Sequence, residues 1–240
     1  MTTNAGLAVN TDRSIDVGLR NYMISVYNRM FIGVALSGVA ALLMSYLSVA
    51  PDGSLNDFGN VILKGPLHIV IALSPLVIVL FMSFGANKFS AASLSLMFYG
   101  LSVLMGISLT SVVLAYTAAS MTKVFFITAS TFGALSLYGY TTKRSLDGFG
   151  SFLIMGLFGL IIAGLVNIFL QSSALDFALS VIGVLVFAGL TAYDTQKIKD
   201  MYDFGAADRA KLVTQGALSL YLDFINLFLF FLNFFGSKDD

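Results

Sequence analysis

The chain alternates long apolar blocks with short polar segments along its whole length. Seven of these blocks are long enough to cross a bilayer as a helix, which requires about 17–25 residues. They lack the alternating polar and apolar positions of a transmembrane β-barrel. The pattern therefore predicts an all-α, polytopic membrane protein with seven transmembrane helices. The predicted spans are residues 30–49, 67–84, 94–116, 124–140, 149–170, 177–193 and 212–235.

Polar segments at both ends divide the chain into three parts. The first 29 residues have no apolar core of the kind found in a signal peptide, so we expect no cleavage on export. We expect residues 1–29 to form a cytoplasmic N-terminal arm, 30–235 a single seven-helix transmembrane domain, and 236–240 a short C-terminal tail. The longest expected loop is 50–66, which contains Pro51 and Pro66.

Composition supports the membrane assignment and excludes several functions. Of 240 residues, 58% are hydrophobic and 11% are charged, whereas a soluble domain carries about 25% charged residues. The net charge is zero, so the chain has no electrostatic footprint for nucleic acid. It has no cysteine, which excludes disulfides, thiolate metal sites and cysteine nucleophiles. The expected surroundings are the lipid bilayer, and no resident cofactor is expected.

The distribution of Lys and Arg predicts the orientation, because cytoplasmic loops carry an excess of these residues. When the segments between spans are assigned alternately to the two sides, ten basic residues fall on the side of the N-terminus and three on the other. We therefore expect a cytoplasmic N-terminus and an external C-terminus, which requires an odd number of spans. The ten are Arg13, Arg20, Arg29, Lys88, Lys143, Arg144, Lys197, Lys199, Arg209 and Lys211; the three are Lys64, Lys123 and Lys238.

Asp223 is the only charged residue within the seven predicted spans. A carboxylate at the centre of a bilayer costs about 2.5–3.5 kcal/mol on insertion scales, so some compensating environment is expected. Lipid satisfies no polar group, so the polar face that contains Asp223 must point to other helices or to water. At 100° per residue, this face spans roughly 80° of the seventh helix. Its members are Gln215, Ser219, Asp223, Asn226 and Asn233.

Asp194 lies just past the end of the sixth predicted span. Alone, an aspartate at such a helix end is commonly just solvated. The sixth and seventh helices form an antiparallel hairpin, however, and positions 194 and 223 are equidistant from a turn predicted at 204–208, with Gly205 ending the sixth helix. The sixth helix would then continue to about residue 202, and both aspartates would lie roughly 20 Å from the turn.

Two carboxylates at one level in a medium of low dielectric constant cannot both stay ionised without a cation. We therefore expect Asp194 and Asp223 to titrate as a unit and to form a pH sensor on an ion pathway. Oxygen ligands from Asp194, Asp223 and Asn226 suit a hard ion such as Ca²⁺. They are fewer than its usual six to eight, so water would complete the shell and binding would be weak and transient.

Two segments of the chain resemble the signature segments of the Bax inhibitor-1 family. They are Tyr193-Asp194-Thr195-Gln196-Lys197-Ile198 and Tyr221-Leu222-Asp223-Phe224-Ile225-Asn226-Leu227-Phe228. The stretch Tyr138-Gly139-Tyr140-Thr141-Thr142-Lys143-Arg144, followed by Gly156-Leu157-Phe158-Gly159-Leu160, is similar to bacterial members of the family. The resemblance runs from about Arg20 to Phe235.

This resemblance implies a fold in which six helices enclose a central, C-terminal seventh helix. It also implies a pH-sensitive calcium leak governed by two aspartates, which correspond to Asp194 and Asp223, and a place in the bacterial inner membrane. Bacterial relatives have been linked to the modulation of a membrane-bound AAA protease. The chain departs from the pattern in one respect: calcium-conducting members can carry an arginine in the second helix, and residues 67–84 contain no Lys or Arg.

Two classes of function remain open on the sequence. The first is a calcium leak or another cation or proton pathway, which the polar stripe favours. The second is a regulatory membrane protein that transports nothing and acts on a membrane-bound AAA protease or in a stress or cell-death response, with residues 1–29 as a flexible tether.

An enzyme is not expected. The only histidine, His68, has no serine–histidine–aspartate or metal-binding spacing around it. Paired acids can serve as acid and base in an intramembrane aspartyl protease. The Gly-rich and Pro-rich segments expected beside such aspartates are absent from this sequence.

Overall fold

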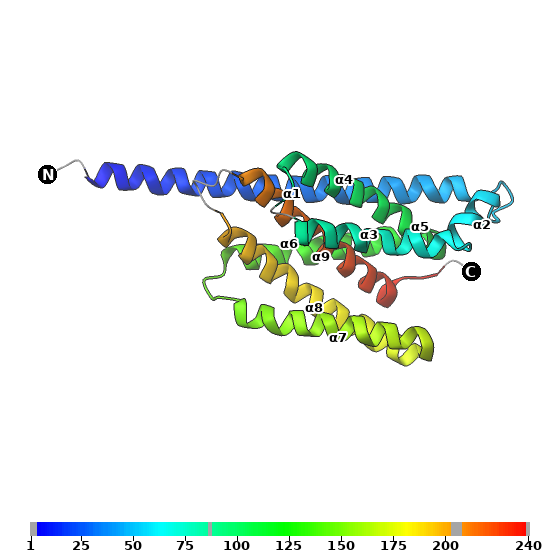
Figure 1. Ribbon diagram of the computed structural model, residues 1–240. Helices are drawn as coiled ribbons and strands as arrows, with labels where there is room; N and C mark the ends of the chain where they lie inside the picture. Colours follow the sequence, from blue (N-terminus) through cyan, green and yellow to red (C-terminus); the bar gives the residue numbers. More distant parts are fainter. Residues whose placement is uncertain (1–3, 86–87, 203–207, 239–240) are drawn as a thin grey trace.

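The computed structural model describes residues 4–85, 88–202 and 208–238, with side chains from residue 17 onward. Within these ranges every regular element is a helix, apart from two isolated β-bridges. The helices are α1 (Asn4–Ser48), α2 (Asp57–Leu63), α3 (Leu67–Gly85), α4 (Ala91–Ser108), α5 (Thr110–Ala115), α6 (Ala118–Thr141), α7 (Asp147–Leu170), α8 (Ser173–Asp200) and α9 (Arg209–Phe235). Figure 1 shows their arrangement as one bundle of roughly parallel and antiparallel rods.

Seven spans in the described chain are long and apolar enough to cross a membrane, which confirms the all-α, seven-helix prediction. The third span consists of α4 and α5 together, with a break at Leu109. The hydroxyls of Ser108 and Thr110 on either side donate to backbone carbonyls three residues earlier, at 2.8 and 2.7 Å. Such back-bonding competes with helix hydrogen bonds and often bends a helix.

The first helix extends further than the sequence pattern indicated. The predicted arm ends at residue 29, whereas α1 continues without interruption from Asn4 to Ser48, and its apolar span begins at Val17. Met23, Val26 and Met30 are buried on one face of this helix, which explains why it packs as part of the bundle well before residue 30. The N-terminal part of α1 projects beyond the other helices (Figure 1).

The end of α8 and the start of α9 agree with the hairpin that the sequence predicted. Helix α8 continues to Asp200, seven residues past the predicted end of its span, and α9 begins at Arg209. The predicted turn at 204–208, with Gly205 as terminator, lies almost wholly outside the described residues.

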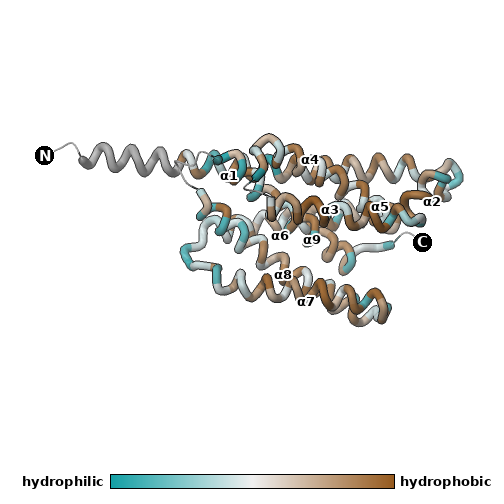
Figure 2. Tube along the Cα trace, viewed as in Figure 1, coloured by the Kyte–Doolittle hydropathy of each residue, from teal (hydrophilic) through white to brown (hydrophobic). Residues whose placement is uncertain are grey.

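Helix α9 lies in the core of the bundle. Half of its most apolar window is buried, the largest share among the seven spans, and it packs against α8, α1, α6 and α4. Helix α3 packs on α4 and α7 packs on α8, so the outer faces of α3 and α7 are directed to lipid. Both are hydrophobic along most of their length (Figure 2). Four helices thus lie directly on α9, and its enclosure by all six remains a prediction.

Two glycines allow the helices around this core to approach closely. A Cβ atom at Gly139 of α6 would collide with the carbonyl oxygen of Ala192 on α8. A Cβ atom at Gly183 of α8 would collide with the ring of Phe230 on α9. Small residues at helix contacts are the usual means of bringing membrane helices together.

The residues after α9 form hydrogen bonds with the connection between α5 and α6 and with the start of α6. Ser237 accepts a hydrogen bond from the backbone N–H of Thr117 at 3.1 Å, and its own N–H donates to Ser120 Oγ at 2.8 Å. Tyr116 and Lys238 form an isolated antiparallel bridge. The predicted short tail is therefore anchored as far as residue 238.

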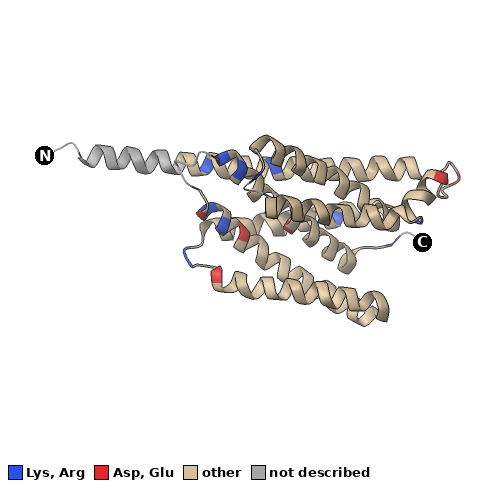
Figure 3. Ribbon diagram, viewed as in Figure 1, with Lys and Arg blue, Asp and Glu red and all other residues tan. Residues whose placement is uncertain are grey.

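The charged residues gather unevenly at the two ends of the bundle. Figure 3 shows most Lys and Arg positions where α6 and α8 end and α7 and α9 begin, with few at the opposite end. This distribution agrees with the basic side assigned from the loops and makes that end the expected cytoplasmic face.

We predict that alkaline phosphatase fused after Asp240 will be active only on the external side of the membrane. The physical reason is the excess of Lys and Arg at the end of the bundle opposite the C-terminus. The measurement is reporter activity in intact cells, with a fusion in the 143–146 connection as the control that should remain inactive. An inactive C-terminal fusion of normal abundance would contradict the orientation.

Candidate functional site

Asp223 lies near the middle of α9 and is almost completely buried, with 4% of its surface exposed. Its Oδ2 atom has no hydrogen-bond partner in the described part of the chain. The neighbouring side chains Tyr221 and Phe224 belong to the hydrophobic core. A buried, unsatisfied carboxyl oxygen is costly, and such groups in membrane helices usually serve a function.

Asp194 lies on α8 and is partly buried. Helix α8 packs against α9, so the two aspartates lie on helices in contact, and the pairing of their carboxyls stays a prediction. Lys197, one turn further along α8, is exposed. Among the described residues no hydrogen bond joins the two carboxyls and no salt bridge reaches either one.

The other members of the predicted polar stripe do not form one continuous site. Gln215 and Ser219 are partly buried on the same helix as Asp223. Asn226 uses its amide N–H to donate to the Leu222 carbonyl at 2.8 Å. Asn233 instead bonds α8 at the opposite end of the hairpin, where it donates to Ser180 Oγ at 2.7 Å. Asn233 therefore fastens α9 to α8 and lies apart from the aspartates.

A hydrogen-bonded chain that the sequence did not predict lies beside Asp194. Tyr27 Oη lies 2.6 Å from Ser136 Oγ, and Ser136 Oγ lies 2.8 Å from Thr195 Oγ1. Thr195 in turn donates to the Thr191 carbonyl at 2.8 Å. This chain joins α1, α6 and α8, and its last member is the neighbour of Asp194. Its partners are up to 109 positions apart in the sequence, so no local pattern reveals it.

A second network holds α9 against α1 and α4. Ser37 Oγ on α1 lies 2.7 Å from Tyr221 Oη and 2.7 Å from the Ser102 carbonyl on α4. Arg29 of α1 donates to Thr214 near the start of α9. Thr214 is nine residues from Asp223, which is roughly 13 Å along the helix, so Arg29 does not replace the missing second-helix arginine beside the aspartates.

Gln196 has a distinct role in the Asp-Thr-Gln segment. Its Nε2 donates to the Arg144 carbonyl at 2.9 Å, and its Oε1 accepts from the Leu146 N–H at 2.7 Å. Lys199, one turn further, donates to the Tyr140 carbonyl at 3.0 Å. These bonds satisfy backbone groups at the end of α6 and in the α6–α7 connection, so α8 fixes the conformation of that connection.

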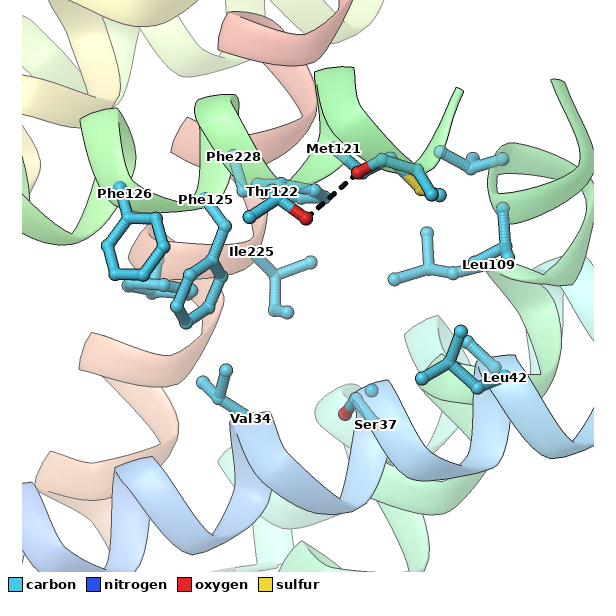
Figure 4. Close-up of a pocket in the computed structure, with 16 residues that line it drawn as sticks. Val34, Ser37, Leu42, Leu109, Met121, Thr122, Phe125, Phe126, Ile225 and Phe228 are labelled. Atoms are coloured by element: carbon cyan, nitrogen blue, oxygen red, sulfur yellow. Dashed lines mark hydrogen bonds between the residues drawn. The ribbon is translucent and has the colours of Figure 1, made fainter. Parts of the chain in front are cut away.

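Two apolar cavities open between α1 and α6, and Phe224 of α9 lines both. Figure 4 shows the first, of about 500 Å³, with Val34 and Leu42 of α1 along one side and Phe125 and Phe126 of α6 along the other. The second, of about 560 Å³, lies toward the basic end of the bundle. Neither cavity is lined by Asp194 or Asp223, so neither gives an ion direct access to the aspartates in this conformation.

The donor set at the aspartates fits a weakly held ion. In the part of the chain that the structure describes, no three His, Cys, Asp or Glu side chains come together. A divalent cation between Asp194 and Asp223 would therefore have two carboxylates, with Asn226 Oδ1 as the only further side-chain ligand predicted from the sequence. Since Ca²⁺ takes six to eight oxygens, water would have to complete its shell, and a cation at this position stays a prediction.

Comparison with known proteins places the chain in a family. The profile of the family described as inhibitor of apoptosis-promoting Bax1 matches residues 19–240. A Caulobacter vibrioides protein is 46% identical over 235 residues, covering 96% of this chain and 94% of its own length. The inner membrane protein YbhL of Escherichia coli is 45% identical over 225 residues, covering 92% of this chain and 93% of its own length. The chain therefore belongs to the Bax inhibitor-1 family.

We predict that Ser136→Ala will destabilise the bundle by about 0.6–1.7 kcal/mol, because it removes the link between Tyr27 and Thr195. The melting temperature of the purified protein in detergent should fall by about 2–4 °C for each kcal/mol. Ser151→Ala is the matched control, since Ser151 is exposed and bonds only within α7. Equal melting temperatures for the two variants would show that the chain of hydroxyls does not stabilise the helix contacts.

Proposed function

We propose that this Bax inhibitor-1 family protein is a pH-sensitive calcium leak of the bacterial inner membrane, gated by Asp194 and Asp223. The observation that carries the proposal is the buried carboxyl of Asp223, whose Oδ2 atom has no hydrogen-bond partner in the described chain, on a helix that packs against α8, the helix of Asp194. A protein that served only as a scaffold would have no use for an ionisable group at this depth, where it costs about 2.5–3.5 kcal/mol.

The gate in this proposal is the contact between α8 and α9. When the two aspartates share a proton, that proton can bridge them and hold the helices together. When the proton is lost, two negative charges either separate the helices or recruit a divalent cation. The cavities described above do not reach the aspartates, which is compatible with a closed state in this conformation.

The same residues suit the passage of an ion better than its storage. Conduction requires a site that binds strongly enough to admit the ion and weakly enough to release it. Two carboxylates and water meet this condition for Ca²⁺. Lys197, three residues after Asp194 on α8, would raise the barrier to cations when the site is empty.

We predict that Asp223→Asn will flatten the pH dependence of calcium flux without unfolding the bundle. Asparagine keeps the shape and hydrogen-bonding capacity of the side chain but cannot ionise, so raising the pH no longer creates two facing charges. In the wild type, calcium flux should rise with pH, because the aspartate pair loses its shared proton as the pH rises. The measurement is calcium entry into proteoliposomes across a pH series, with a fluorescent indicator inside.

Asp200→Asn is the control for a general charge effect, because Asp200 is exposed at the end of the same helix that carries Asp194. It should leave the pH profile unchanged. If Asp223→Asn conducts with the wild-type profile, the two aspartates are structural and the proposed gate is wrong.

A second candidate function is regulation of another membrane protein, such as a membrane-bound AAA protease, or a role in a stress response. The observation that favours it is the projection of α1 beyond the other helices (Figure 1), which offers a partner a surface outside the bundle. Deletion of residues 2–16, before the apolar span that begins at Val17, separates the two functions. A leak should retain its calcium flux after this deletion, whereas a regulator should lose its partner.

A further inference from the structure

The second of the two cavities is a lateral opening on the side of the bundle, here called the α1–α6 crevice. Its walls include Ile24 and Phe31 of α1 and Gly133 and Leu137 of α6, and its floor includes Phe224 of α9. Its volume of about 560 Å³ lies within the range of about 300–1,000 Å³ that is typical of small-molecule pockets.

The walls of this crevice face the bilayer. Ile24, Phe31 and Leu137 have 44%, 54% and 63% of their surfaces exposed, and all three belong to spans that cross the membrane. A Cβ atom built on Gly133 would meet nothing within 4 Å, so the space in front of this residue is open. Unfilled apolar space loses dispersion contacts, and in a membrane the available filling is hydrocarbon.

One end of the crevice is basic. Arg20 lines it, and Tyr140, another lining residue, accepts a hydrogen bond from Lys199 Nζ through its carbonyl at 3.0 Å. No Asp or Glu is among the residues that line the crevice in the described chain. The first cavity, by contrast, has no charged residue in its lining. Basic pockets between membrane helices on the cytoplasmic side bind anionic head groups.

We propose that the α1–α6 crevice is a binding site for one anionic phospholipid from the leaflet at the basic end of the bundle. The phosphate lies against Arg20, with Lys199 nearby, and an acyl chain runs along Ile24, Gly133 and Leu137 to Phe224. This site goes beyond the proposed calcium leak and does not depend on it. Because Ser136 and Tyr27 also line the crevice, a bound chain packs against the hydrogen-bonded link to Thr195.

The first test is native mass spectrometry of the detergent-solubilised full chain with phosphatidylglycerol or phosphatidylcholine of identical acyl chains. The wild type should retain one phosphatidylglycerol in preference to phosphatidylcholine. In Gly133→Leu the Cβ atom meets nothing within 4 Å and the side chain enters the crevice, so this variant should lose that lipid. Gly159→Leu is the matched control, because a Cβ atom there also meets nothing within 4 Å but the residue lies on α7. It should retain the lipid.

The second test separates the head group from the chain and does not rely on the folding of Gly133→Leu. Arg20→Gln should lower the preference for phosphatidylglycerol by about fivefold, the effect of one basic residue near an anionic surface. Lys143→Gln is the control, since Lys143 is exposed at the same end but does not line the crevice. It should leave the preference unchanged.

Four results would overturn the proposal. Retention of phosphatidylglycerol by a folded Gly133→Leu protein would place the lipid elsewhere. Equal retention of both lipids by the wild type, or an unchanged preference in Arg20→Gln, would remove the role of the basic end. Displacement of a co-purified membrane polypeptide, instead of a lipid, by Gly133→Leu would make the crevice a contact for another helix.

Discussion

The structure depends on one constraint: inside a bilayer no water satisfies polar groups, so each must find a partner within the protein. Helix α9 is the most buried of the seven spans in the described chain, and it still carries polar side chains along its length. Tyr221 and Thr214 find partners on α1, and Asn233 finds them on α8. Asp223 Oδ2 is the exception in this helix, because no described group bonds it.

The hydrogen bonds that satisfy these groups also decide which helices form a unit. Tyr27, Ser136 and Thr195 join α1, α6 and α8, while Ser37 and Tyr221 join α1 and α9. Helices α3 and α7 carry few such groups and pack on the outside of α4 and α8. These polar contacts link α1 with α6, α8 and α9.

The two apolar cavities between α1 and α6 also involve α9. Phe224, the neighbour of Asp223, packs edge-on against Phe125 and Phe132 of α6 and separates the two apolar cavities. Phe224 itself is buried, so protein side chains cover this side of α9 while the two cavities reach it. Lipid composition and the protonation of the aspartates would act on neighbouring parts of the same helix.

The sequence by itself determined the seven helical spans and the two candidate aspartates. The tertiary structure decided which helices and side chains contact one another. Hydropathy predicted seven spans, since the requirement for about 20 apolar residues is local. The isolation of Asp223 among apolar residues and the symmetry of the hairpin predicted that Asp194 would lie at the same level. The sequence could not reveal that α1 begins packing before residue 30, that Asn233 bonds α8 apart from the aspartates, or that Ser136 joins Tyr27 to Thr195. These contacts join helices distant in the chain, and a serine or asparagine in an apolar helix carries no information about which helix will lie opposite it.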